Sequence, residues 1–367
     1  MRSCSICLLA LLLGACGFAQ REVQVFPADE PPENLSAWGV LQADGDQLVL
    51  NAGVIPYELN SALFSDYALK LRTVWMPEAS SATYHADREF EFPVGTIISK
   101  TFHYRKAEDW RSGHASVKYA AQERVENSVP PLDLKRQWLL ETRLLVRYTD
   151  GWRAFPYVWN AAQTDATLEI AGELRQFTLD KDGELQPVNY VVPDVNQCGG
   201  CHTPDHTAGN LRPLGPRAWQ LNRPYAWWQD AGSQVNHWRD RGLLLKAPEM
   251  DVTTPGSLEQ RARAYLDANC AHCHNPAGAA DTSALHLNIE APLDRKFGLC
   301  KTPVAVGRGS GDHSYDIYPG RPEESIMVYR MQHTDPAIAM PELGRGIVHV
   351  EGVALISEWI AALPGEC

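Results

Sequence analysis

The sequence predicts a multidomain α+β protein, in which a β-rich, sandwich-like domain comes first and a mainly α-helical region follows. A chain of 367 residues is long enough for two or three domains. Residues 37–192 contain repeated runs of β-branched and aromatic residues, which favour strands. From about residue 196 onward these runs give way to short helical patterns joined by Pro- and Gly-bearing loops, and this change separates the two regions.

The composition is that of a globular protein, with 44% hydrophobic and 21% charged residues. Lys and Arg number 33 against 45 Asp and Glu, which gives a formal net charge of −12 at pH 7. No block of basic residues is long enough to follow a phosphate backbone, so we expect no nucleic-acid partner. The mild acidity is compatible with a basic protein partner but is also ordinary for an exported protein.

The first residues read MRSCSICLLALLLGACGFAQ, in which Arg2 precedes an apolar run and then small residues. This pattern is typical of a secretory signal peptide, and the run is too short to span a membrane. Its end, Leu-Gly-Ala-Cys, resembles the motif at which bacteria attach diacylglycerol to a cysteine. We therefore expect a lipoprotein signal peptide over residues 1–15 and a lipid anchor on Cys16, with ordinary cleavage at residues 17–19 as the alternative.

Residues 21–36 are rich in Pro and Glu, which predicts a tether over residues 16–36 between the anchor and the folded body. The β-rich domain follows over residues 37–192. Asp-Gly pairs at 150–151 and 182–183 separate strand-like runs, and each is a two-residue hairpin signal. This part of the chain is therefore expected to be antiparallel and rich in hairpins.

The aromatic run GWRAFPYVWN in this domain has two interpretations. Trp152, Tyr157 and Trp159 could form a platform that binds a ligand, or they could fill the core. We favour the core interpretation, because aromatic residues repeating with period 2 are what a half-buried strand requires.

Two copies of Cys-x-x-Cys-His follow the β-rich domain, as CGGCH at 198–202 and CAHCH at 270–274. This is the attachment motif of c-type haem, in which two thiols bond to the porphyrin and the histidine binds the iron. A zinc ribbon would need its cysteine pairs about 15 to 20 residues apart, and a thioredoxin-like pair would need a βαβ setting. We therefore expect two covalent haems c. The residues that would hold them are Cys198, Cys201, His202, Cys270, Cys273 and His274.

A helical pattern in PGSLEQRARAYLDANCAHCH leads into the second motif, with Ser257 as a candidate N-cap. Another helical pattern closes the chain before Pro364. Its stripe contains Val350, Val353, Ala354, Ser357, Ile360 and Ala361. Between the two, DPAIAMPELGRG sets Met340 beside a proline in a Gly-rich loop, as in class I c-type cytochromes. We expect Met340 to be the sixth ligand of the iron bound by His274, with a core-filling methionine as the alternative.

The first motif has no equally clear sixth ligand. His237 in QVNHWRDRGLLL and Met250 in LLKAPEMDVTTPG are the candidates that follow it. His103 and Met76 would have to come from the β-rich domain. His206, on a continuing helix, would lie on the same side of the iron as the motif histidine and could not reach across it. An open or water-bound iron is the alternative to all of these.

Nine cysteines are present, and those of the leader, the anchor and the two motifs account for all but Cys300 and Cys367. In an oxidising compartment two remaining cysteines are expected to form a disulfide. This bond would pin the last residue of the chain to the body of its domain, whereas two free thiols are the alternative.

The chain contains NQCGGCH, LGPRAWQLNR, YLDANCAHCHNPAG, GLCKTPVAVGRGSG and YPGRPEESIMVYRM, with YELNSALFSDYALKLRTVWMP and LLETRLLVRYTDGWRAFPYVWN in the front half. With these stretches it resembles a family of predicted dihaem c-type cytochromes of Gram-negative bacteria, from about residue 37 to 367. The resemblance implies an exported protein with an N-terminal β-domain and one haem on each Cys-x-x-Cys-His motif. It implies no particular substrate.

These patterns predict a signal peptide over 1–15, a tether over 16–36, the β-rich domain over 37–192, a first haem-binding segment over 193–254, and a class I-like cytochrome c domain with an insertion over 255–367. The mainly α-helical region is thus expected to be a c-type cytochrome region. We expect a lipid-anchored protein on the periplasmic side of a membrane, as an outer-membrane lipoprotein of a Gram-negative bacterium. Its expected function is the transfer of single electrons between redox proteins, which the sequence does not identify. The alternative is a peroxidase-like dihaem oxidoreductase with an open site at the His202 haem.

Overall fold

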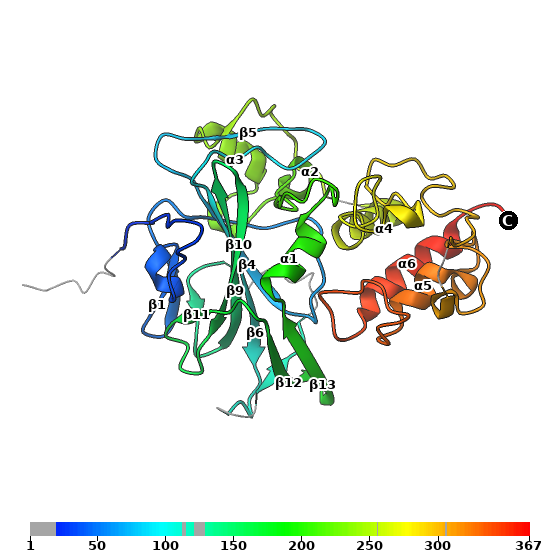
Figure 1. Cartoon of the computed structure of the whole chain (residues 1–367), viewed down its shortest axis with the longest axis horizontal. Helices are drawn as coiled ribbons and strands as arrows, with labels where there is room; N and C mark the ends of the chain where they lie inside the picture. Colours follow the sequence, from blue (N-terminus) through cyan, green and yellow to red (C-terminus); the bar gives the residue numbers. More distant parts are fainter. Residues whose placement is uncertain (1–19, 112–114, 121–128, 255, 305–306) are drawn as a thin grey trace, which may run out of the picture.

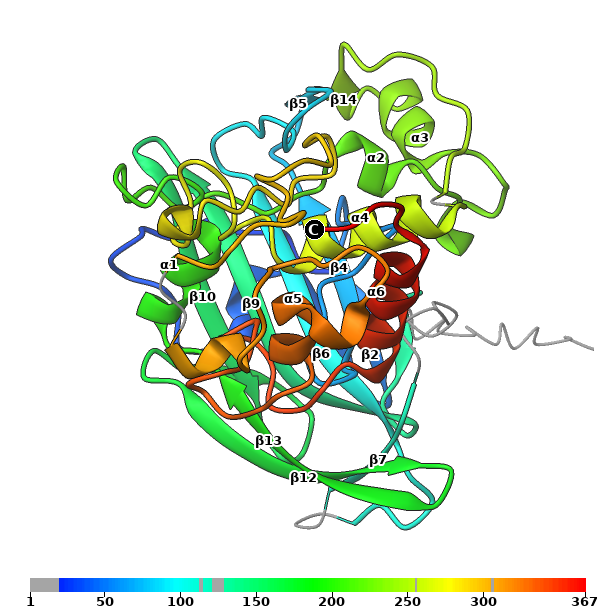
Figure 2. The ribbon, with the colours of Figure 1, turned by 90° about the vertical axis from the view of Figure 1, so that its right-hand side faces the viewer.

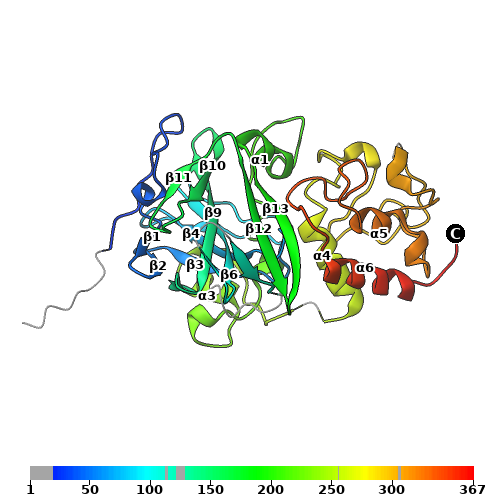
Figure 3. The same ribbon diagram turned by 90° about the horizontal axis from the view of Figure 1, so that it is seen from below.

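A computed structural model of the full chain describes residues 20–111, 115–120, 129–254, 256–304 and 307–367. The expected signal peptide, Cys16 and the start of the tether lie outside the described residues. The chain forms a large β-rich body and a smaller C-terminal lobe, residues 256–367. The two lie side by side in both Figure 1 and Figure 3.

A nine-stranded sheet forms the centre of the β-rich body. Its strands are β3 (Ile55–Tyr57), β4 (Leu69–Trp75), β6 (Ile97–Lys106), β7 (Ser116–Lys118), β9 (Gln137–Tyr148), β10 (Gly151–Trp159), β11 (Ala166–Leu168), β12 (Glu173–Lys181) and β13 (Glu184–Val192). The main path is β11-β10-β9-β6-β7-β12-β13, and β4 pairs with both β3 and β6. Among the strand pairs described for this sheet, the pair of β7 and β12 is parallel and the others are antiparallel.

Both expected hairpins are present. In the hairpin of β9 and β10 the pair next to the turn is Tyr148 with Gly151. In the hairpin of β12 and β13 it is Lys181 with Glu184. In the second turn the φ angles of its two residues, an Asp and a Gly, are 54° and 94°. Two positive φ angles are what a type I′ hairpin turn requires, and Asp-Gly is one of the few pairs that adopt them easily.

One face of the sheet is covered mostly by residues that precede it in the chain, together with a short strand from between β7 and β9. The covering elements are the 3₁₀ helix η1 (Leu35–Trp38) and a small sheet of β1 (Leu41–Asp44), β2 (Gln47–Leu50) and β8 (Leu132–Asp133). Trp38, Leu71 and Leu144 are fully buried in this core. The indole of Trp38 donates a hydrogen bond to the hydroxyl of Tyr157 across 2.7 Å, which satisfies both buried polar groups.

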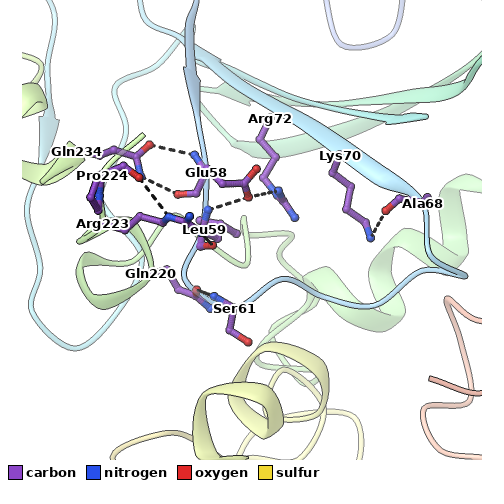
Figure 4. Close-up of polar contacts among 10 residues, drawn as sticks. All are labelled: Glu58, Leu59, Ser61, Ala68, Lys70, Arg72, Gln220, Arg223, Pro224 and Gln234. Atoms are coloured by element: carbon purple, nitrogen blue, oxygen red, sulfur yellow. Dashed lines mark hydrogen bonds and ion pairs between the residues drawn. The ribbon is translucent and has the colours of Figure 1, made fainter. Parts of the chain in front are cut away.

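The opposite face carries the segment that follows the sheet. Its elements are α1 (Val195–His202), α2 (Ala218–Leu221), the 3₁₀ helix η3 (Ala226–Trp228), α3 (Gln234–Asp240) and β14 (Leu244–Leu245), which pairs with β5 (Ala82–Thr83). Figure 4 shows the contact that fixes it: the Gln234 amide donates to the Glu58 carbonyl (2.9 Å) and accepts from the Glu58 N–H (3.0 Å). The Glu58 carboxylate is paired with Arg72 at 2.9 Å. Because these groups are buried, the segment is held to the sheet by specific polar contacts.

The aromatic residues of β10 belong to the core on both faces of the sheet. Tyr157 and Trp159 pack with the core around η1, whereas Trp152 packs with the core under α2 and α3. All three are buried. The core interpretation of this run is therefore confirmed.

The C-terminal lobe lies in front of the sheet in Figure 2. Its elements are α4 (Leu258–Asn269), η4 (Asp281–Ser283), η5 (Gly307–Ser310), η6 (Pro322–Glu324), α5 (Ile326–Met331) and α6 (Val350–Ala362). Ser257 caps α4 as expected, because its hydroxyl accepts from the Gln260 N–H across 3.1 Å. α4 and α6 pack together, with Leu266, Ile356 and Trp359 buried in the lobe's core.

The expected fold class is wrong in both parts. Strand residues (26%) outnumber helix residues (20%), and the described residues after 193 do not form a mainly α-helical region. Long loops rich in Pro and Gly separate α4, α5 and α6, so the helical patterns stay short.

The front part is dominated by one large curled sheet with the small sheet of β1, β2 and β8 on one face, and it is not a sandwich of two comparable sheets. β6 pairs with β4 along residues 97–103 and with β7 at residues 105–106, while β9 runs along its other edge. The register with β9 shifts between Phe102 and His103. An irregularity of this kind bends and twists a strand, so the sheet continues around the bend and does not split into two facing layers.

Candidate haem sites

The first motif lies on α1, which begins directly after the last strand of the sheet. Asp194 caps this helix, since its carboxylate accepts from the N–H groups of Asn196 and Gln197, each across 2.8 Å. Cys198 is buried against the sheet side of the helix, and α1 contacts β10. The end of β13 thus fixes where the first pair of cysteines lies.

The second motif begins where α4 ends. Cys270 is the C-cap residue, and the N–H of His274 donates to the Cys270 carbonyl across 2.9 Å. The motif is therefore a tight turn that continues from the helix. All four motif cysteines, Cys198 and Cys201 on α1 and Cys270 and Cys273 here, are free thiols.

The two motifs touch each other. The Cys273 thiol lies 3.4 Å from the carbonyl oxygen of Gly200, inside the first motif. The hydrogen bond between the thiols of Cys201 and Cys273 lowers the pKa of Cys201 and raises the pKa of Cys273. Downstream, the backbone N–H and Nδ1 of His206 both bind the carbonyl of Ala277, at 3.0 and 2.9 Å. His206 therefore joins the segments after the two motifs and does not face the cavities at His202.

The imidazole of His202 is held by a backbone carbonyl. Its Nδ1 lies 2.9 Å from the Arg212 carbonyl oxygen, and the Arg212 N–H donates back to the His202 carbonyl across 2.7 Å. A carbonyl only accepts, so Nδ1 carries the proton and Nε2 keeps its lone pair. Burial lowers the pKa of His202 to about 4, which keeps the ring neutral at physiological pH.

His274 has the same arrangement through a hydroxyl. Its Nδ1 lies 3.0 Å from Ser283 Oγ, and that hydroxyl donates to the Ala280 carbonyl across 2.6 Å. Because the hydroxyl proton is used in this way, Nδ1 of His274 is the donor and Nε2 is again the free acceptor. Burial lowers the pKa of His274 to about 4. A metal-binding histidine is commonly oriented by such a bond at its other nitrogen.

His274 and Met340 line the same cavity, which has a volume of about 200 Å³. Most of its remaining wall is apolar and includes Leu285, Leu287, Ile326, Met327 and Met331. The buried ion pair of Lys301 and Asp316 (2.9 Å) lies at the same cavity. An imidazole and a thioether in an apolar cavity are a donor set that fits haem iron. The residues at the second motif therefore fit the expected group.

Met340 is fixed in its loop by backbone contacts. Its N–H donates to the Arg330 carbonyl across 3.1 Å, and its carbonyl accepts from the Arg345 guanidinium across 2.8 Å. Arg345 also donates to the His333 carbonyl at 2.8 Å. One guanidinium thus ties the methionine loop to the end of α5.

Two cavities, of about 270 and 410 Å³, adjoin the first motif. Both are lined by His202 and by Lys100 and Arg143 of the sheet. Cys198, Cys201 and Met340 line the smaller one. Burial and the neighbouring guanidinium groups of Arg72 and Arg143 lower the pKa of Lys100. The space at His202 is thus larger than the space at His274, and Lys100 and Arg143 of the sheet line it.

The sequence-derived candidates for the sixth ligand at His202 do not line these cavities. His237 Nε2 binds Asp230 across 2.8 Å, and its ring stacks on Trp228. Met250 packs at the edge of the core under α2 and α3. His103 is buried in the sheet with Nδ1 on Gln137 (3.0 Å), and Met76 packs in the same core as Met250. The distance along the chain from His202 does not predict which residues reach it, because the segment of α2 and α3 packs on the sheet away from α1.

Cys300 and Cys367 form a disulfide in the structure, as the sequence predicts. The bond joins the last residue to a loop between η4 and η5. It holds the end of the chain after α6 against the lobe.

Among the described residues, no group of three or more His, Cys, Asp or Glu side chains could hold a metal ion alone. Haem does not need such a group, because the porphyrin nitrogens supply four of the iron ligands. In the same part of the chain no helix has the length and apolar character of a membrane span. Comparisons with protein-family models, with curated proteins and with solved structures gave no match. The resemblance to dihaem cytochromes therefore stays a prediction.

Proposed function

We propose that the protein is a c-type cytochrome that carries two covalent haems and passes single electrons between redox partners. The observation that carries this proposal is the contact between the two motifs, where Cys273 Sγ meets the Gly200 carbonyl at 3.4 Å. Two attachment motifs in contact would hold two cofactors side by side, as transfer within one chain requires. A haem at each motif would supply a one-electron iron couple.

At the first site Cys198 and Cys201 would form the two thioether bonds and His202 would bind the iron through Nε2. The Arg212 carbonyl holds the proton of His202 on Nδ1. This bond orients the ring and raises its basicity as a ligand. The sheet side of α1 excludes water from Cys198.

At the second site Cys270, Cys273 and His274 would play the same parts, and Met340 would be the sixth ligand. Ser283 orients His274 as the carbonyl orients His202. Ligation by His and Met raises the reduction potential of haem iron and leaves no open position. This site is therefore suited to electron transfer and not to substrate binding.

A peroxidase-like dihaem oxidoreductase is the second candidate. It is favoured by one observation: the cavities at His202 are larger than the cavity at His274 and include the cations Lys100 and Arg143. Neither His237 nor Met250 lines them. An open position at His202 would admit a small substrate, and the second site would then exchange electrons with it.

We further propose that diacylglycerol on Cys16 holds the protein on the periplasmic side of a membrane, as an outer-membrane lipoprotein. The support is the sequence alone, because Cys16 lies outside the described residues. Two lipid chains on one residue are enough for stable anchoring.

The proposed function is tested by counting covalent haems on the protein made in cells that attach haem c. We expect two haems per chain by intact mass and by the absorption of the denatured protein, and a reversible one-electron titration for each. The variant Cys198→Ser/Cys201→Ser should keep one haem, and so should the equivalent variant of the second motif. Cys300→Ser/Cys367→Ser removes two cysteines outside the motifs and should keep both haems. A chain without covalent haem would contradict the proposal.

A further inference from the structure

Three basic residues lie side by side across the central strands of the sheet. Arg72 on β4 is the direct partner of Lys100 on β6, and Lys100 is the direct partner of Arg143 on β9. These three residues form the cation row. In-register neighbours in a sheet point to the same face, and all three line the cavity of about 410 Å³ that His202 also lines.

Two members of the cation row have their own carboxylate. Arg72 pairs with Glu58 at 2.9 Å, and Arg143 binds both oxygens of Glu141, at 2.8 and 2.5 Å. Lys100 has no carboxylate within ion-pair distance among the described residues. Its ammonium group lies over the ring of Phe102, 4.8 Å from the centroid.

The other charged groups of this cavity are already matched. Arg217 pairs with Asp267 at 3.1 Å, and Glu89 faces Arg212 at 3.7 Å. The row therefore presents one uncompensated positive charge, on Lys100, to this cavity.

The two carboxylates offset two of the three charges, so Lys100 is the member that is costly without an anion of its own. Like charges directly opposite each other on neighbouring strands are destabilising, and a buried charge needs a partner. Two guanidinium groups and an ammonium group together make a strong site for a carboxylate, because each can donate more than one hydrogen bond. The spare donors of Arg72 and Arg143 lie on either side of Lys100.

We propose that the cation row binds a carboxylate beside His202. Two sources supply such a carboxylate. One is a haem of the first site, which carries two carboxylate groups, and for this source the inference rests on the proposed function. The other source is a free small carboxylate that enters the cavity, which suits the oxidoreductase candidate. Both sources would place a negative charge in the cavity that His202, the proposed iron ligand of the first site, also lines.

The test compares the holoprotein with Lys100→Met, which keeps an unbranched apolar stem of similar size and removes the ammonium group. Lys296→Met is the matched control, because Lys296 is exposed on the lobe. Lys100→Arg keeps the charge and should behave like the wild type. Acetate at constant ionic strength is the probe, and the melting temperature and the midpoint potential of each haem are the two readouts.

If a haem carboxylate occupies the row, Lys100→Met leaves that carboxylate without its ammonium partner. The melting temperature should then fall, and acetate should have no effect. The potential of one haem should also change, and that of the other should not. If a free carboxylate occupies it, acetate should raise the melting temperature of the wild type and of Lys100→Arg saturably, but not that of Lys100→Met.

The proposal is overturned if Lys100→Met melts as high as Lys296→Met or higher and acetate changes neither the wild type nor the variant. That result would mean that an unpaired buried charge had merely been removed. Failure of the proposed function looks different. A chain without haem would refute the dihaem proposal, while a saturable acetate effect that needs Lys100 would still support the anion site.

Discussion

The thiol sulfur of Cys273 lies 3.4 Å from the carbonyl oxygen of Gly200, which stands between the two cysteines of the first motif. α1 contacts β10 of the sheet and α4 packs in the core of the lobe, so this contact joins the β-rich body to the lobe. It brings together two motifs that are far apart in the sequence. Each motif keeps a neutral histidine with a free Nε2.

Replacing Met340 should alter one haem only. We expect Met340→Ala to remove the near-infrared absorption of a thioether-ligated ferric haem and to lower the potential of that haem, because Met/His ligation raises it. Met250→Ala is the control, since Met250 lies away from the cavity of His274 and should leave both haems unchanged. An unchanged near-infrared spectrum in Met340→Ala would refute the ligand assignment.

Removing the hydroxyl that orients His274 should raise the potential of the same haem. Ser283→Ala deletes the acceptor of the Nδ1 proton, which lies 3.0 Å away, and leaves a less basic imidazole. The free energy of unfolding should fall by about 1 kcal/mol, as for a typical lost hydrogen bond. Ser310→Ala removes an exposed hydroxyl of η5 and serves as the control for spectroelectrochemical titration. Equal potentials in the two variants would argue against the role of Ser283.

Asp66 should make the protein less stable as the pH rises. Its carboxylate accepts the N–H groups of Gly346 (2.8 Å) and Ile347 (3.0 Å), which join the β-rich body to the lobe. Burial raises its pKa from 3.8 to about 6, although Lys70 and Arg345 act in the opposite direction. The folded state then holds more protons than the unfolded state between about pH 4 and 6. The contribution of Asp66 to the free energy of unfolding should therefore fall by about 3 kcal/mol across that window and stay constant above it.

The measurement is the free energy of unfolding in denaturant at pH 4.5 and pH 7. Asp66→Asn has no charge to titrate and should lose this part of the pH dependence. Asp44→Asn, at an exposed position of β1, should keep it. The same pH dependence in both variants would mean that Asp66 does not titrate in this window.

The lipid anchor predicts a change of location for one cysteine variant. Cys16→Ser should release the protein from the membrane fraction into the soluble periplasm, because lipid attachment needs the thiol. Cys7→Ser alters a leader cysteine and should leave the protein on the membrane. Fractionation followed by detection of the haem answers the question, and membrane-bound Cys16→Ser would exclude the anchor.

The parts of the fold that depend on local chemistry could be predicted from the sequence. The Asp182-Gly183 turn, the Ser257 cap and the pairing of Cys300 with Cys367 need only neighbouring residues or a count of cysteines. The single curled sheet could not be predicted, because it depends on β6 changing partner from β4 to β7. That choice is made by long-range pairing, which no run of residues records.

The buried face of the last helix and the cation row both depend on contacts between elements that are distant in the sequence. The stripe predicted for the last helix places Ala354 and Ala361 inside, but both are exposed, and the buried face holds Ile356 and Trp359. Several apolar faces were available on this apolar helix, and its contact with α4 selects one. The cation row could not be predicted from the sequence, because Arg72 and Arg143 become neighbours of Lys100 only when the strands are in register.

The electron paramagnetic resonance spectrum of the fully oxidised protein tests the electron-carrier proposal most directly. We expect two low-spin ferric haems, one with the signature of His/Met ligation that is lost in Met340→Ala, and no change when cyanide is added at low concentration. A high-spin ferric signal that cyanide converts and peroxide consumes would contradict the carrier and favour the oxidoreductase.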